Sequence, residues 1–95
     1  MPVYLTVTIT LKDPEVFTEY GAKARPLFAD CGAEVVLVGR VAGHLHGASG
    51  HHMEVVARFP DRAALDNWYN SPAYQELIPL RDKGADVVFK IVEPL

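Results

Sequence analysis

A short segment that occurs twice constrains the fold of this 95-residue chain more than any other feature. Gly-Ala-Glu-Val-Val at residues 32–36 returns as Gly-Ala-Asp-Val-Val at residues 84–88. Each copy follows a stretch with helical spacing and opens a β-branched stretch that predicts a strand. Asp13 and Asp61 repeat in the same way, because each follows a predicted strand and is suited to cap the helix after it. The chain is therefore predicted to contain two β-α-β halves.

Alternating hydrophobicity and turn residues define the predicted strands. These strands are residues 3–11, 33–39, 51–59 and 85–94. In the first strand, apolar side chains alternate strictly with tyrosine and threonine, so one face is expected to be buried. We expect the second strand to bulge at Gly39 and Arg40 and to continue over residues 41–46, before a glycine-rich turn at 47–50.

Three segments have the spacing and the caps of helices. They are residues 13–32, 60–70 and 71–84, with N-caps at Asp13, Asp61 and Ser71. Gly32 and Gly84 are placed to end the first and the last helix. Pro26 predicts a kink near Ala22, and Pro79 predicts that the last helix is shortened or bent.

Two interleaved β-α-β halves give an α+β fold, the ferredoxin-like βαββαβ plait, with a four-stranded antiparallel sheet and the helices on one face. We expect residues 1–95 to form a single domain. The other sheet face would be bare, and its predicted members are Tyr4, Thr6, Thr8, Thr10, Glu54, Val56, Arg58, Val88, Lys90 and Val92. Because this face has few charges, we expect a homodimer that packs sheet against sheet, with Glu54 paired to Arg58 or Lys90. A monomer with a solvated, threonine-rich face is the alternative.

The composition limits which binding partners and which cellular compartment are expected for this protein. The net charge is −3 and the basic residues are scattered, so we expect no nucleic acid partner. No apolar run is long enough to span a membrane, and residues 1–10 lack the features of a signal peptide. Cys31 is the only cysteine, which suits a reducing compartment. We therefore expect a cytoplasmic protein without a membrane partner.

Three segments resemble the family catalogued as domain of unknown function 1330. They are residues 13–20, 57–81 and 85–93, and the matching positions are Asp13, Pro14, Phe17, Tyr20, Phe59, Pro60, Trp68, Tyr69, Ser71, Pro72, Tyr74 and Arg81. That family is similar to the dimeric α+β barrel superfamily, which includes cofactor-independent monooxygenases and muconolactone isomerase-like enzymes. The resemblance implies the same dimeric, ferredoxin-like fold. Arg58 occupies a position where the family often has an acidic residue, so no role of that carboxylate is carried over.

Tyr20, Trp68, Tyr74 and Arg81 are the candidate ligand-binding residues. All four belong to predicted helices, and the resemblance implies a ligand cavity between the helices and the sheet. The aromatic rings would form apolar walls, and Arg81 would hold a carboxylate or enolate oxygen through its N–H donors. Core packing is the alternative for the aromatic residues, and a surface position near a helix C-terminus is the alternative for Arg81.

Two functions of different classes stay open. One is a cofactor-independent enzyme, monooxygenase-like or isomerase-like, that acts on a small enolisable or aromatic acid. The other is a non-catalytic dimer that binds a small molecule or has a structural role. No coupled acid–base pair can be placed from the sequence, so no catalytic residue is assigned, and no cofactor is expected.

All four histidines lie between residues 44 and 52. If residues 41–46 paired with residues 51–59, His46 would lie opposite His51, and His44 would share their face. Three imidazoles arranged in this way could hold Zn²⁺ or Ni²⁺. The turn is rich in glycine and no acidic neighbour orients the rings, so we expect a solvated loop without a metal and keep the metal site as an alternative.

Overall fold

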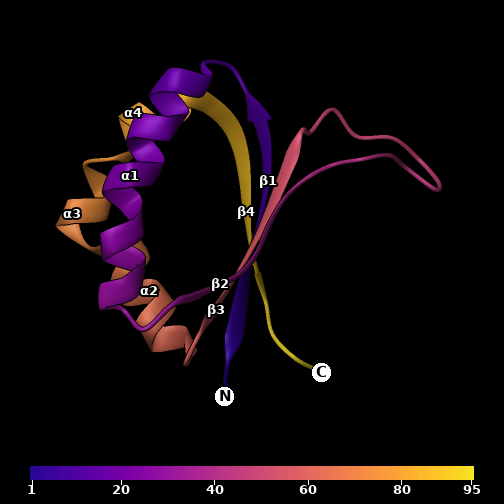
Figure 1. The fold of residues 1–95 in the computed structure, drawn as a ribbon. Helices are drawn as coiled ribbons and strands as arrows, with labels where there is room; N and C mark the ends of the chain where they lie inside the picture. The colour runs from indigo at the N-terminus through magenta and orange to yellow at the C-terminus, as the bar shows by residue number, and fades with distance from the viewer.

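The computed structural model describes all 95 residues, and its four-stranded antiparallel sheet is covered on one face by helices (Figure 1). The elements are, in chain order, β1 (Val3–Leu11), α1 (Pro14–Asp30), β2 (Glu34–Arg40), β3 (Met53–Phe59), α2 (Arg62–Asn70), α3 (Pro72–Gln75), α4 (Ile78–Gly84) and β4 (Ala85–Val92). The strand order across the sheet is β2-β3-β1-β4. This order and the antiparallel pairing confirm the predicted ferredoxin-like plait.

Strand β1 lies in the middle of the sheet, and its strict alternation explains which face is buried. Its inward side chains Val3, Leu5, Val7 and Ile9 are at most 5% exposed and form the centre of the core. The intervening tyrosine and threonines lie on the opposite face and are half-buried. Burial of one face in this way fixes the register, because a slip by one residue would expose the whole apolar set.

The ends of α1 are set by its flanking residues, as predicted. The carboxylate of Asp13 accepts a hydrogen bond from the backbone N–H of Val16. Gly32 has a φ of +74°, the left-handed conformation that closes many helices. The helix continues through Pro26, where Ala22 and Pro26 are exposed and water can bind the carbonyl that loses its donor, and the kink expected near Ala22 stays a prediction.

Both detailed predictions for the second strand are wrong. The register shift occurs between Val35 and Leu37 rather than at Gly39, which pairs regularly with Glu54. An edge strand such as β2 can bulge without disturbing a second neighbour. The strand ends at Arg40, and residues 41–52 form an irregular loop that extends beyond the sheet, away from the helices (Figure 1).

The last predicted helix is divided in two, as the position of Pro79 suggested. Ser71 caps α3 by accepting a hydrogen bond from the backbone N–H of Tyr74, and α3 ends at Gln75. Pro79 has no N–H to give to the carbonyl of Gln75, so the helix stops and restarts with Pro79 in the first turn of α4.

The sheet face opposite the helices is uncovered in the single chain, as predicted. Thr6 is paired with Val56 on one side and with Lys90 on the other, so the expected set does share one face. Leu37, Val88 and Val92 on this face are about half exposed. Arg58 forms its ion pair with Glu34, at 3.9 Å, and not with Glu54 of the same chain. None of the helices has the length and apolar character needed to cross a membrane.

Candidate ligand-binding site

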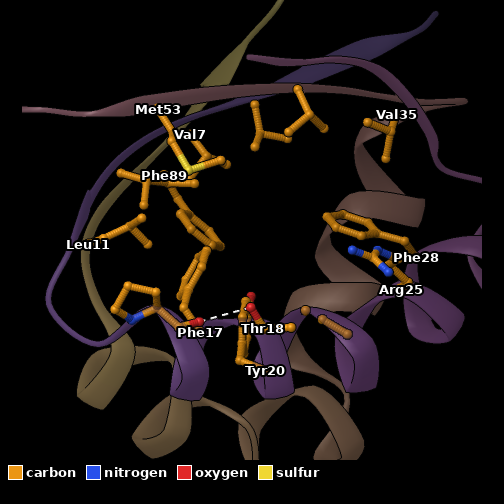
Figure 2. Close-up of a pocket in the computed structure, with 16 residues that line it drawn as sticks. Val7, Leu11, Phe17, Thr18, Tyr20, Arg25, Phe28, Val35, Met53 and Phe89 are labelled. Atoms are coloured by element: carbon orange, nitrogen blue, oxygen red, sulfur yellow. Dashed lines mark hydrogen bonds between the residues drawn. The ribbon is translucent and has the colours of Figure 1, made fainter. Parts of the chain in front are cut away.

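A cavity of about 320 Å³ lies between α1 and the sheet (Figure 2). Helix α1 packs mainly against α4, which leads into the edge strand β4, and β2 lies at the opposite edge of the sheet. Val35 and Val38 of β2 line the cavity and stay 47% and 57% exposed, so this side is the mouth. The inner wall is formed by buried residues of β1, among them Val7 and Ile9.

The helical wall of the cavity follows from residue size along one face of α1. Phe17 and Phe28 lie toward opposite ends of the cavity in Figure 2. Gly21 and Ala24 lie between them in the sequence and also line the wall, and their small side chains leave the space open. Tyr20 lies on the same face and is the one phenol in the lining.

Polar groups along the cavity wall are few. The hydroxyl of Thr18 donates to the carbonyl of Pro14 at 2.8 Å, the dashed line in Figure 2, so this hydroxyl is already paired. Arg25 is the only charged residue in the lining, and it is exposed beside Phe28. A cavity with this lining favours an apolar or aromatic ligand with few polar atoms.

A cluster of one arginine and three tyrosines adjoins the cavity, and all of its members except half-buried Tyr69 are buried. The Nη1 of Arg81 donates to the hydroxyl oxygens of Tyr74 and Tyr69, at 3.2 Å each. The hydroxyls of Tyr74 and Tyr20 are hydrogen-bonded to each other at 2.8 Å. The guanidinium carbon of Arg81 lies 4.9 Å from the ring centroid of Phe89, which also lines the cavity. Tyr20 and Phe89 therefore separate the cation from the cavity.

Burial determines the ionisation of this cluster. Burial raises the pKa values of Tyr20 and Tyr74, so both phenols are neutral at ordinary pH. Burial alone would lower the pKa of Arg81, but its hydrogen bonds to Tyr69, Tyr74 and Asp82 outweigh burial and raise it. Arg81 is therefore a buried cation, and the carboxylate of Asp82 accepts from its Nε at 3.0 Å.

The structure brings the four candidate residues together but gives them different positions. Tyr20 lines the cavity, and Trp68 lines a second cavity of about 340 Å³ beside β1 and β4. Tyr74 and Arg81 line neither cavity and connect to the first one through Tyr20. The surface position considered for Arg81 is wrong, because the residue is only 9% exposed. The three donors that Arg81 uses point at side chains of the same chain rather than into the cavity.

Two members of the site were not among the sequence candidates. Tyr69 shares the Arg81 nitrogen with Tyr74, and it stands next to Trp68 in the segment that resembles the family. Phe89 lines both cavities, and it occupies an inward position of the alternating last strand. The sequence pattern at both positions indicated a buried aromatic residue, but core packing alone was enough to explain that pattern.

The histidines do not adopt the arrangement that the metal-site alternative needs. The strands end before them, so His46 and His51 are not a cross-strand pair. The ring of His44 contacts Ser49, whereas the Nδ1 of His51 lies 2.9 Å from the hydroxyl of Thr10. No group of three or more His, Cys, Asp or Glu residues lies close enough together to hold a metal ion.

Solved structures with this fold include proteins of unknown function and one oxygenase. A protein of unknown function from Rhodopseudomonas palustris has a TM-score of 0.87 and 22% identity, over 99% of this chain and 82% of that chain. A dimeric ferredoxin-like protein of unknown function from Jannaschia has a TM-score of 0.77 and 14% identity, over 99% of this chain and 100% of that chain. SnoaB, a cofactor-independent oxygenase from Streptomyces nogalater, has a TM-score of 0.71 and 12% identity, over 99% of this chain and 93% of that chain.

Sequence identities this low show that the fold is shared and nothing more. No curated protein sequence matches the chain. The model of one family matches residues 2–95, and the chain therefore belongs to the family described as domain of unknown function (DUF1330).

Proposed function

We propose that this protein is a homodimer that binds a small, largely apolar ligand in the cavity between α1 and the sheet. The observation that supports this proposal best is the cavity itself. Its volume of about 320 Å³ lies within the range of small-molecule sites, and 12 of its 16 lining residues are hydrophobic. Protein interiors are close-packed, so a small domain that binds no ligand would be expected to fill such a space with its own side chains.

The uncovered sheet face supports the dimer. Exposed Leu37, Val88 and Val92 lie on it, and its charges include both signs, with Glu54 and Lys90 as examples. A second copy packed sheet against sheet would cover the apolar side chains and place opposite charges near each other. The Jannaschia protein of the same fold is dimeric, which is consistent with this arrangement.

The second candidate function is enzymatic. The protein would act without a bound cofactor on a small enolisable or aromatic substrate. The observation in its favour is the hydrogen-bonded series from the Arg81 cation through Tyr74 to Tyr20, which lines the cavity. Such a series can stabilise negative charge on a substrate oxygen. SnoaB, which shares the fold, is a cofactor-independent oxygenase. A cytoplasmic location stays a prediction based on the single cysteine.

Two nearby residues of β2 allow the cavity and the dimer to be tested separately. Val38 faces the cavity, whereas Leu37 faces the opposite side of the sheet, and both are more than half exposed. Val38→Asp should weaken binding of nitrobenzene, measured by ligand-observed NMR, and should leave the dimer intact. Leu37→Asp should shift the protein from about twice 10.5 kDa toward 10.5 kDa in native mass spectrometry.

The two substitutions serve as controls for each other, because each places the same charge on the same exposed strand. Equal nitrobenzene affinity for Val38→Asp and the unsubstituted protein would remove the cavity from the proposal. A monomer at all concentrations for the unsubstituted protein would remove the dimer. Extra mass on the purified, tag-free protein would reveal a ligand retained from the cell.

A further inference from the structure

The buried cluster beside the cavity contains more hydrogen-bond donors than acceptors. Arg81 has five N–H donors and no acceptor, and Tyr20, Tyr69 and Tyr74 each have one O–H proton. Of these three phenolic protons, only one is used between members of the cluster, in the bond between Tyr20 and Tyr74. The indole N–H of Trp68 is buried beside the cluster and has no partner either. Asp82 accepts the Nε–H of Arg81, and half-buried Tyr69 can give its proton to water, so the buried groups left without a partner are donors.

The geometry indicates which proton is left over. Tyr74 is fully buried and accepts a hydrogen bond from the Arg81 cation, so its own proton is the more acidic of the pair. When both phenols are neutral, the more acidic one is the better donor, which makes Tyr74 the donor and Tyr20 the acceptor. The O–H proton of Tyr20 then has no acceptor within the chain, and Tyr20 is the member of the pair that lines the cavity.

We propose that the ligand brings a single acceptor oxygen to the hydroxyl of Tyr20, and that this oxygen is the phenolate or enolate oxygen of a small aromatic compound. This inference rests on the proposed function and specifies the ligand of the same cavity. An unpaired donor in an apolar site carries a free-energy cost that an acceptor on the ligand removes. Tyr20 would touch the ligand, whereas Tyr74 and Arg81 are positioning residues that act through it.

The position of Arg81 favours an anion over a neutral oxygen. Its ion-pair partner Asp82, at 3.0 Å, is more than half exposed and is screened by water. The guanidinium carbon lies 4.9 Å from the Phe89 ring centroid, behind the cavity wall, so this side of the cation acts across an apolar region where electrostatic interactions are strong. A carboxylate fits less well, because its two oxygens need several donors, and apart from Thr18, whose hydroxyl is already paired, Tyr20 is the only lining residue with a hydroxyl. The expected ligand therefore has one anionic oxygen on an otherwise apolar ring system.

The test uses 4-nitrophenol, whose anion absorbs visible light, with nitrobenzene and 4-nitrobenzoate as matched probes. The pKa of bound 4-nitrophenol is read from a visible-absorbance titration with pH and compared with that of the free compound. We expect this pKa to fall on binding, and 4-nitrophenolate to bind more tightly than either matched probe. Tyr20→Phe should weaken 4-nitrophenolate binding by about tenfold, the size of one hydrogen bond to a charged group, and should leave nitrobenzene binding unchanged.

The role of Arg81 is tested with the pKa of the bound 4-nitrophenol, which loss of packing alone would not change. Arg81→Met should raise the pKa of the bound probe, and Arg81→Lys should restore part of the difference because it returns the charge. If the Arg81 variants unfold, the pKa of the probe bound to the unsubstituted protein still decides the question.

Each outcome has one meaning. Nitrobenzene binding without any preference for 4-nitrophenolate, or a bound pKa that does not fall, would overturn the ligand class and leave the cavity proposal standing. Tighter binding of 4-nitrobenzoate would also overturn it, in favour of a carboxylate. Binding of none of the three probes would overturn the proposed function as well.

Discussion

Gly84 is the position at which one added carbon atom should disturb this protein most. A Cβ atom on Gly84 would lie 2.8 Å from the backbone nitrogen of Phe17 and 2.9 Å from its Cα. Contacts this short with backbone atoms cannot be relieved by rotating a side chain. The substitution Gly84→Ala should therefore push α1 and α4 apart, and with α1 it should move Phe17 in the cavity wall.

The expected size of the effect follows from two opposing contributions. Overpacking in a buried site destabilises by about 1–3 kcal/mol, and a clash with backbone belongs at the upper end of that range. Replacing glycine by alanine near a helix end stabilises the helix by at most about 1 kcal/mol. The net loss should be about 2 kcal/mol, which lowers the melting temperature of a domain this size by roughly 8–16 °C.

Urea unfolding at one fixed protein concentration measures this loss, since dimerisation would otherwise change the midpoint. Gly43→Ala is the matched control, because a Cβ at Gly43 meets nothing within 4 Å. The control should stay within about 0.5 kcal/mol of the unsubstituted protein. An unchanged midpoint for Gly84→Ala would refute the close approach of the two helices, and with it the way in which α1 is held away from the sheet.

Two further predictions concern the helix caps and the buried phenols. Asp61→Ala should destabilise by about 1 kcal/mol in urea unfolding, and Asp13→Ala by less, because the cap bond of Asp61 measures 2.8 Å and that of Asp13 measures 3.3 Å; a larger loss for Asp13 would contradict this ranking. Burial raises the pKa values of Tyr20 and Tyr74 in the folded state, so above the ordinary tyrosine value of 10.0 the unfolded state loses these protons first and the free energy of unfolding falls as pH rises. Tyr20→Phe should flatten that fall when midpoints are compared across alkaline pH, and an equally steep fall for Tyr20→Phe would contradict this reasoning.

Local patterns in the sequence were enough to predict the elements and their order. The alternation of β1 separates a buried face from an open one, and Asp13, Asp61 and Ser71 each cap the helix that follows them. These features depend on neighbours in the chain, so they are visible in the sequence. The repeated Gly-Ala-acid-Val-Val segment then limited the topology to two β-α-β halves, which the sheet order confirms.

Features that depend on contacts between distant segments were missed or misplaced. The bulge at Val36 and the end of β2 at Arg40 depend on how an edge strand meets β3, and the glycines at 39 and 43 gave no reliable guide to either. Gly84 was expected only as a helix end, whereas its lack of a side chain allows the close approach to Phe17.

For the site, the residue types were visible in the sequence and their connections were not. Tyr20, Trp68, Tyr74 and Arg81 could be named because aromatic rings and an arginine recur in the helical segments. Only the packing of α1 against α4 determines that Tyr20 lines the cavity while Arg81 is buried behind it and is hydrogen-bonded to Tyr74. The sequence by itself determined the elements, the buried face and the chemistry available, because these depend on local spacing. The tertiary structure decided where the cavity lies and which of the phenols lines it, because both depend on the distance between helices and strands that are far apart in the chain.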